Sequence, residues 1–585
     1  MFLRTPRARR LAALFFGAAA AAVPLSGCGG SSSPAKGPDP ARAVPASAAL
    51  YAGATLRPSG ALASSARAAG QALTHQSDPY RRLLGALQLP GAPALDFNRD
   101  VSPWLGTQGG LFVSGAGTSH ARAAVASLLS SLEQAILGGS GQISFPFGAP
   151  AAPAAGAVGA DGAILLDTTN SHAAETFLHE QAAHAGAHAT SYRGVSFQAG
   201  AGGVALGLVH GFAVIGTESA LRAVIDTTAG AAPLASAPSY AALRAAVPAG
   251  ELGHVYLPGE GVAPASTGAS AGTGTGSASQ LLSLLAGGTP TDISLIPAAG
   301  TIALDVDTLP SAAPSAPAGL LAGGAEASRA VSELPGESFV AVGLGSGASI
   351  GRFVHALSAT ASLGRPGSEA PGLSINGLLG AALAPVSILT EESASARREF
   401  HSWLGPGALF ASGSGLADLR AGLVIDSRNP ALSRAAVAKV AARLRAAGDS
   451  VSAASIPGTD AAASVQARGL PIALDIADGR DSRGQTKFVI GLGEASVAEA
   501  LNPSSAFAAA PSYAAAAAQL GGGAQPSLVV QLPTLLSLLE GIGLAEDPTI
   551  RGLVPLGRAL TTVSAGTSRL SGGVQRTRVV AGLRG

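Results

Sequence analysis

The 585-residue chain has little cysteine, little aromatic character and little charge. Cys28 is its only cysteine, which excludes an internal disulfide and a metal cluster held by several thiolates. Charged residues make up 12% of the chain and the formal net charge is +1, so there is no basic excess to favour nucleic-acid binding. Long apolar runs are missing beyond the N-terminus. The best later candidate, residues 378–389, is shorter than the ~18 residues of a membrane-spanning helix and contains Pro385.

The first 28 residues have the composition of an export signal. Four arginines precede an apolar stretch at residues 11–23, and Leu25-Ser26-Gly27-Cys28 follows. This order resembles the signal and lipobox of bacterial lipoproteins, in which the cysteine sulfur receives a diacylglycerol and the chain is cut before the cysteine. The new amine is usually acylated as well, and two acyl chains give stable anchoring. The resemblance implies an extracytoplasmic protein anchored to the cell membrane through Cys28, with a net charge of −3 once the four arginines are removed.

Matching segments recur in the same order in the two halves of the chain, which indicates an internal duplication. The only two tryptophans, Trp104 and Trp403, each begin a Trp-Leu-Gly segment. An Asp-x-x-Asn pattern and an Ala-Pro-Ser-Tyr pattern follow in both halves. The residues that mark them are Asp167 with Asn170 and Tyr240 in the first half, and Asp426 with Asn429 and Tyr513 in the second.

The pattern predicts an α+β fold of two tandem homologous units. Short alternating strands joined by hairpin turns indicate an antiparallel sheet in each unit, and we expect the helices to pack on one face of it. The expected segments are a signal peptide at 1–27, the lipidated cysteine and a flexible tether at 28–43, a first unit at 44–308, a linker at 309–333 and a second unit at 334–585. The first unit carries an insertion at 116–160 and a low-complexity loop at 260–279.

Several of these signals together resemble a known family. They are Val44-Pro45-Ala46 before a strand, the Trp-Leu-Gly segment, the Ser-Tyr helix and a closing strand with Arg576-Thr577-Arg578. The combination is similar to the domain of unknown function 3352 (DUF3352) family of bacterial envelope proteins, over about residues 44–310 and 334–583. The resemblance implies location and general architecture. It supplies no activity, substrate or functional residue.

One short motif suggests catalysis. Gly347-Ala348-Ser349-Ile350-Gly351 is a G-x-S-x-G between a predicted strand and a predicted helix, the setting that exposes a nucleophilic serine. It overlaps a G-x-G-x-x-A pattern at 343–348 that would suit a dinucleotide. The equivalent first-unit loop, Arg57-Pro58-Ser59-Gly60, keeps a serine before a helix but neither glycine pattern. We therefore interpret Ser349 as a helix N-cap.

Histidines gather between residues 172 and 188, where they could bind a metal. His184 and His188 have the i, i+4 spacing that places two ligands on one helical face, but Gly186 between them indicates that the helix ends there. The matching helix of the second unit carries arginine and lysine instead. A solvated helix face is therefore the interpretation, with His184 and His188 kept as the candidates for a metal site. The Asp-x-x-Asn residues are interpreted as turn and cap residues, and the tryptophans as core.

No set of residues combines a nucleophile, a base and a group that orients the base. We therefore predict a non-catalytic envelope lipoprotein without a cofactor, whose sheets bind a lipid or other hydrophobic ligand, the cell wall or a protein partner. The alternative is an envelope serine hydrolase that uses Ser349.

Replacing Cys28 with serine tests the anchoring. The variant lacks the sulfur that would carry the lipid, so we expect Cys28→Ser to lose labelled palmitate and to be released from the membrane or misprocessed. Metabolic labelling and fractionation measure both effects. Equal palmitate incorporation into variant and wild type would contradict lipid anchoring.

Overall fold

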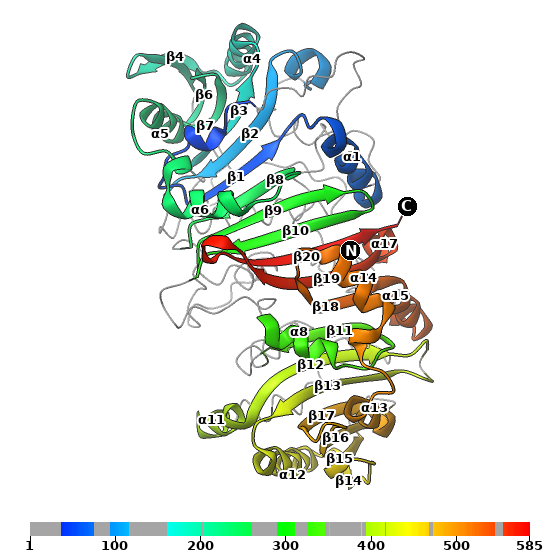
Figure 1. Ribbon diagram of the computed structural model, residues 1–585. Coiled ribbons are helices and arrows are strands. Elements are labelled where there is room, and N and C mark those ends of the chain that lie inside the picture. Colours follow the sequence, from blue (N-terminus) through cyan, green and yellow to red (C-terminus); the bar gives the residue numbers. More distant parts are fainter. Residues whose placement is uncertain are drawn as a thin grey trace, which may run out of the picture. The chain divides into compact units, whose positions relative to one another are not determined.

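The computed structural model describes residues 37–74, 94–115, 161–200, 203–259, 289–310, 324–345, 350, 388, 394–415, 417–466, 472–544 and 554–584 (Figure 1). Cys28, Ser349, the insertion at 116–160 and the loop at 260–279 lie outside these residues. The chain divides into two compact units. The N-terminal unit takes the described residues up to residue 318 together with Arg569–Arg576 and Leu583–Gly585, and the C-terminal unit takes Gly319–Ser568 and Thr577–Gly582.

The N-terminal unit is an antiparallel sheet with helices. Its strands are β1 (Leu50–Thr55), β2 (Leu105–Val113), β3 (Gly162–Thr168), β4 (His188–Tyr192), β5 (Val195–Ala199), β6 (Val204–Val209), β7 (Phe212–Thr217), β8 (Gly253–Leu257), β9 (Thr291–Ala298) and β10 (Thr301–Thr308). They pair in the order β4-β5-β6-β7-β3-β2-β1-β8-β9-β10. Its helical segments are η1 (Pro40–Arg42), α1 (Gly60–Thr74), η2 (Phe97–Val101), α4 (Ser171–His184), α5 (Glu218–Thr228), η3 (Leu234–Ser236), α6 (Pro238–Ala246) and η6 (Ser571–Gly573).

The C-terminal unit has strands β11 (Ser338–Gly345), β12 (Leu404–Ser412), β13 (Arg420–Ser427), β14 (Ser450–Ala453), β15 (Thr459–Gln466), β16 (Leu474–Arg480), β17 (Thr486–Leu492), β18 (Gln525–Gln531), β19 (Leu560–Arg569) and β20 (Gln575–Leu583). They pair in the order β14-β15-β16-β17-β13-β12-β11-β18-β19-β20. Its helical segments are α8 (Gly324–Ser332), α11 (Ala394–Trp403), α12 (Pro430–Ala446), α13 (Gly493–Leu501), η4 (Phe507–Ala509), α14 (Pro511–Leu520), α15 (Leu532–Gly541) and α17 (Val554–Ala559).

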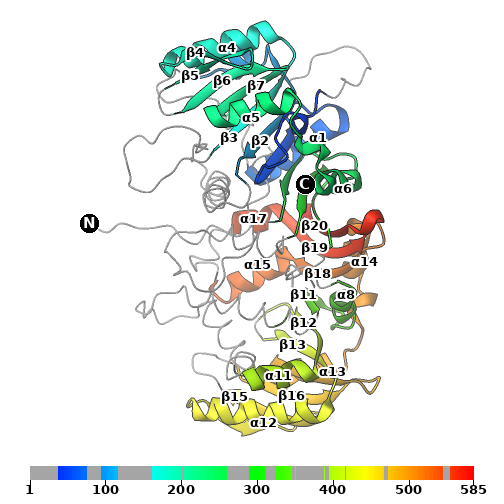
Figure 2. The ribbon, with the colours of Figure 1, turned by 90° about the vertical axis from the view of Figure 1, so that its left-hand side faces the viewer.

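Helices cover both faces of the central strands in each unit, so the expectation of helices on one face is wrong. On β3, Ile164 and Leu166 belong to the core cluster of α4, whereas Leu165 belongs to the cluster of α5. Successive side chains of a strand point to opposite faces, so these two helices lie on opposite sides of the sheet (Figure 2). In the C-terminal unit, Ile425 packs in the cluster of α12 and Val424 in that of α13. The physical reason is the apolar character of both faces: Gly162–Asp167 is buried without interruption.

The tryptophans and asparagines of the repeated segments have the structural roles expected of them, whereas Asp167 and Asp426 are not turn or cap residues: Asp167 accepts a bond from the Thr107 amide and Asp426 pairs with Lys487. Trp104 and Trp403 are each 1% exposed and come directly before β2 and β12. Asn170 caps α4, where its side-chain oxygen accepts a hydrogen bond from the Ala173 amide at 3.1 Å. Asn429 caps α12 in the same way through the Leu432 amide at 3.3 Å. The backbone oxygens of the two tryptophans also accept equivalent bonds, from the amides of Thr169 and Arg428.

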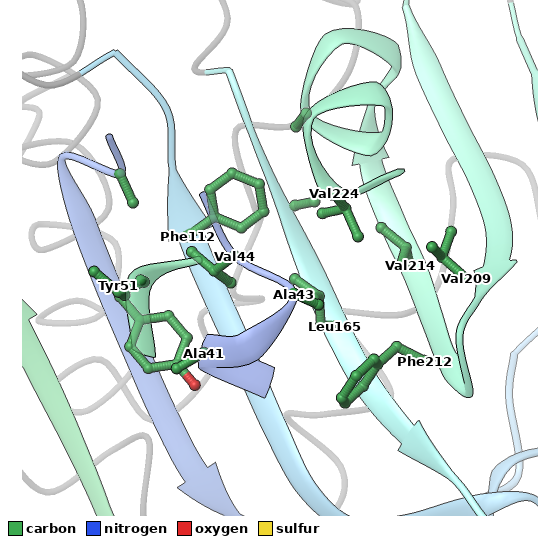
Figure 3. Close-up of a cluster of buried hydrophobic side chains, with 14 of the residues drawn as sticks. Ala41, Ala43, Val44, Tyr51, Phe112, Leu165, Val209, Phe212, Val214 and Val224 are labelled. Atoms are coloured by element: carbon green, nitrogen blue, oxygen red, sulfur yellow. The ribbon is translucent and has the colours of Figure 1, made fainter. Parts of the chain in front are cut away.

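The last part of the predicted tether is folded rather than flexible. Asp39 caps η1, and Ala41 and Ala43 are at most 1% exposed. Figure 3 shows Ala41, Ala43 and Val44 among Tyr51 and Phe112 in the core of the N-terminal unit. The small side chains of alanine fit where the backbone approaches the sheet closely, so the described chain belongs to the folded unit well before residue 44.

Candidate functional site

The N-terminal unit contains a cavity of about 710 Å³, large enough for a small-molecule ligand. Its walls come from the segment Gly37–Arg42, from α6 and from the loop 247–252, and its floor comes from β1, β2 and β8. Each of these elements also packs into the core of the unit through neighbouring residues. The cavity is therefore formed by elements that are anchored in the core of the unit.

Glycine on the floor makes room for aromatic rings. Gly53 on β1 pairs with His254 on β8, and a Cβ atom at residue 53 would lie 2.6 Å from the Cε1 atom of the imidazole. Tyr51 and Tyr240 complete the group: the ring centroids of Tyr51 and His254 are 5.5 Å apart and those of Tyr51 and Tyr240 are 5.9 Å apart. Any larger residue at position 53 would displace a ring of this group.

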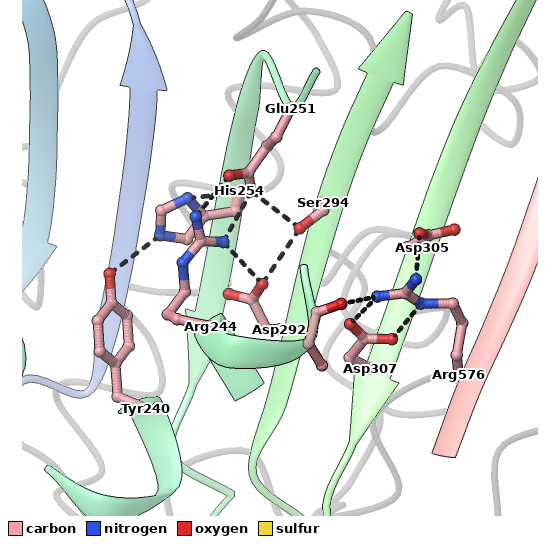
Figure 4. Close-up of polar contacts among 10 residues, drawn as sticks. Tyr240, Arg244, Glu251, His254, Asp292, Ser294, Asp305, Asp307 and Arg576 are labelled. Atoms are coloured by element: carbon pink, nitrogen blue, oxygen red, sulfur yellow. Dashed lines mark hydrogen bonds and ion pairs between the residues drawn. The ribbon is translucent and has the colours of Figure 1, made fainter. Parts of the chain in front are cut away.

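A charged network lines the cavity next to these rings (Figure 4). Arg244 on α6 makes a two-bond ion pair with Glu251, with N–O distances of 2.7 and 2.5 Å, and donates a third bond to Asp292 at 3.1 Å. The Nδ1 atom of His254 lies 3.3 Å from Glu251, and its Nε2 atom lies 3.3 Å from the hydroxyl of Tyr240. Glu251 thus holds both the guanidinium and the imidazole in fixed orientations.

The pKa shifts follow from burial and these contacts. Burial alone would raise the pKa of Glu251, but hydrogen bonds from Arg244 and His254 and their charges outweigh it and hold that pKa well below its ordinary value. Burial raises the pKa of Tyr240 far above its ordinary value. The chain Glu251–His254–Tyr240 therefore keeps a neutral hydroxyl, which can donate or accept a hydrogen bond but is a poor nucleophile.

A second ion cluster lies in the same unit, to which Gln575 and Arg576 at the start of β20 belong. Arg576 makes a two-bond ion pair with Asp307, at 2.8 and 2.7 Å, and lies 3.3 Å from Asp305. Its guanidinium also donates to the Ala246 carbonyl at the end of α6. Burial raises the pKa of Asp307 in spite of Arg576, and the nearby carboxylates of Asp305 and Asp292 add to the increase. The last turn of α6, which carries Arg244, is therefore fixed from both sides.

Apart from Tyr513, the positions of the C-terminal unit that correspond to this charged and aromatic network carry alanine or serine instead. The two units can be aligned on the hydrogen bonds from Leu234 to Val44 and from Phe507 to Leu334, and on Tyr240 and Tyr513. Counting from these residues, Tyr51, Arg244, Glu251, His254 and Asp292 correspond to Ala341, Ala517, Ala524, Ser527 and Ser564. The hydroxyl of Tyr513 instead donates to the side chain of Gln525.

The C-terminal unit has a smaller polar site of its own. A pocket of about 130 Å³ contains Lys487, 5% exposed, whose ammonium lies 2.7 Å from Asp426 and 2.8 Å from Glu333. In the N-terminal unit the residue opposite Asp167 is Phe212, and Asp167 accepts a bond from the Thr107 amide. The two recurring aspartates are therefore used differently, and Asp426 takes part in an ion-pair cluster that its repeat position did not predict.

The histidine candidates do not form a pair on one helix. His184 is the last residue of α4 and His188 is the first of β4, with Gly186 at a positive φ of 62° between them, so the predicted end of the helix is confirmed. Among the described residues, no group of three or more histidine, cysteine, aspartate or glutamate side chains is arranged to hold a metal ion. Within the same residues, no helix is both long and apolar enough to cross a membrane.

Sequence reasoning selected Tyr240 but missed Arg244, Glu251 and His254. A signal for them was present in the repeat itself. Residues 237–258 contain these three ionisable groups, whereas the matching segment 510–533 contains no charged residue and no histidine. Charged residues that occur in only one of the two matching segments are not required by the strand pairing that both segments have.

The ion pair of Glu251 gives a stability test. We expect Glu251→Gln to lower the free energy of unfolding at neutral pH by about 3–5 kcal/mol, because it breaks a buried pair. The depressed carboxyl pKa stabilises the folded state above the unfolded value of 4.5, and this contribution is lost as pH falls further. The difference between variant and wild type should therefore shrink below that pH. Thermal and denaturant melting across this range measures it.

Glu218→Gln is the matched control, since Glu218 pairs with Arg222 on the exposed surface of α5 and should contribute only about 0.3–0.5 kcal/mol. Equal losses for the two variants would contradict the role given to Glu251.

Comparison with known proteins confirms the resemblance to the DUF3352 family. The family model described as "Protein of unknown function (DUF3352)" matches residues 11–378, which is well over half of the chain. No curated protein and no solved structure matches the chain. The cavity and all of its charged residues lie within the matched span. The chain therefore belongs to the DUF3352 family of proteins of unknown function.

Proposed function

We propose that this protein is a non-catalytic binding protein of the bacterial cell envelope, and that the cavity of the N-terminal unit takes a small ligand. One observation carries the proposal: Arg42, Tyr51, Arg244, Glu251 and His254 line the cavity at positions where the C-terminal unit has alanine or serine, whereas Tyr240 and Asp39 correspond to Tyr513 and Arg329. Buried charges are costly to a fold even when paired. The C-terminal unit has the same strand order without these charged residues, so the fold does not require them. This supports a role for them in binding a ligand.

Two homologous units in tandem are part of this proposal. The identical order of strand pairing, the paired Asn caps and the paired tryptophans support a duplication of one ancestral unit. On this view the first copy acquired a polar cavity and the second acquired the Lys487 cluster. On the same view, the shared fold kept each unit stable while the polar residues of each unit changed independently.

The location follows from the N-terminal pattern. We propose that Cys28 is lipidated after removal of residues 1–27 and that the anchored protein is extracytoplasmic. Residues 29–36 would then separate the lipid from the folded chain, which the structure describes from Gly37.

Filling the cavity tests the binding function. Thr55 lies on the floor of the cavity at the end of β1, so Thr55→Phe should occupy the ligand volume. We expect native mass spectrometry of the detergent-extracted wild type to detect a small-molecule adduct that Thr55→Phe loses. Thr190→Phe, on β4 of the same unit, is the matched control and should keep the adduct. An adduct that survives in Thr55→Phe would show that the ligand, if any, lies elsewhere.

Ser349 separates the proposal from the serine hydrolase. A capping serine should not react with a fluorophosphonate, and Ser349→Asp should keep the helix cap, because aspartate caps as well as serine. We expect no labelling of the wild type. Stoichiometric labelling that disappears in Ser349→Asp, at an unchanged melting temperature, would favour the hydrolase. Ser349→Ala should cost about 0.5–2 kcal/mol if the residue is only a cap.

A further inference from the structure

The cavity keeps several hydrogen-bonding groups that the internal network does not use. Thr55 and Gln108 face each other across β1 and β2 on the floor, and Arg42 lies at the wall formed by η1. Their side chains make no hydrogen bond or ion pair with any other residue that the structure describes. One oxygen of Asp39 accepts a bond from the Ala41 amide, which leaves the second oxygen available. Donors and acceptors are thus mixed around the cavity.

The formal charges of the carboxylates and guanidiniums that line the cavity balance. Asp39 and Glu251 provide two negative charges, and Arg42 and Arg244 provide two positive charges. A site for phosphate or another anion would need an excess of positive charge, and a site for a cation the reverse. Balanced charge leaves hydrogen bonds as the means of recognition and favours an uncharged polar ligand.

The planar polar side chains of the cavity can form paired hydrogen bonds with two adjacent hydroxyl groups of a ligand. A carboxylate accepts two parallel hydrogen bonds, and a guanidinium or a primary amide offers a fixed fork. The cavity holds these groups in Asp39, Arg42, Gln108, Arg244 and Glu251, and the neutral hydroxyl of Tyr51 lies among them. Two adjacent hydroxyls on a ring can both donate to a carboxylate, both accept from a guanidinium, or do one of each with a primary amide, so they complement all of these groups. An apolar ligand would leave the partly buried side chains of Thr55 and Gln108 without hydrogen-bond partners.

We propose, on the basis of the binding function above, that the ligand of this cavity is an uncharged sugar of mono- or disaccharide size. The volume of about 710 Å³ lies within the range of small-molecule sites. Gln108 and Arg42 supply contacts to the hydroxyls, and Glu251 keeps Arg244 and His254 in place. The folded segment Gly37–Arg42 makes one wall, so the site forms only when this segment is docked.

Saturation-transfer NMR on the full-length, detergent-extracted protein tests the proposal. The probes are maltose, cellobiose, trehalose and N,N′-diacetylchitobiose, with glycylglycine and inorganic phosphate as charged comparators. We expect at least one sugar to receive saturation from the wild type and to lose it in Thr55→Phe. Gln108→Leu and Arg42→Ala should each weaken binding about threefold to tenfold, the effect of one or two lost hydrogen bonds.

Gln198→Leu, half-buried on β5 of the same unit, is the matched control and should bind the sugar as the wild type does. Melting curves of every variant show which are folded, and Arg42→Ala tests the site without altering the floor. Absence of sugar binding, or sugar binding that no cavity variant changes, overturns the proposal. Binding of glycylglycine or phosphate alone, lost in Thr55→Phe, would overturn the sugar and leave the binding function standing. A protein that binds no probe and carries no adduct would overturn both.

Discussion

Burial of both faces of the central strands is the constraint on which the rest of each unit depends. Gly162–Asp167 is buried throughout, with the cluster of α4 on one side and that of α5 on the other. Polar side chains can enter such a structure only with partners, because an unpaired buried charge is very costly. The two-bond pairs of Arg244 with Glu251 and of Arg576 with Asp307 meet this requirement. The polar cavity lies beside them, where the sheet is covered by a short helix and a loop instead of a long apolar helix.

The sequence predicted local structure correctly at residues whose type has one dominant structural role. Asn170 and Asn429 cap helices because their side chains replace a missing backbone acceptor, and Trp104 and Trp403 fill the core because little else in this alanine-rich chain is large. Alternation along the strands predicted antiparallel pairing correctly. The presence of helices on the second face could not be predicted, because it depends on the packing of α12 and α13 against opposite sides of β13, and α13 is far from that strand in the sequence.

The candidate site was predictable only in part. Tyr240 stood out because its surrounding segment recurs in the second half of the chain. Recurrence selects residues that the two halves share, whereas Arg244, Glu251 and His254 occur in one half only. Arg244, Glu251 and His254 are scattered along residues 237–258 without a motif spacing, and the register of β8 and the turn of α6 bring them together. The role of Asp292 depends on β9 pairing with β8, a long-range contact that has no local signature.

The ion pair of Arg576 with Asp307 has a consequence for biosynthesis. The two residues are 269 positions apart, yet the pair closes the N-terminal unit behind α6. A chain that is synthesised or exported from its N-terminus presents Asp305 and Asp307 long before their partner arrives. This ion cluster of the N-terminal unit can therefore form only after the last residues of the chain have been made.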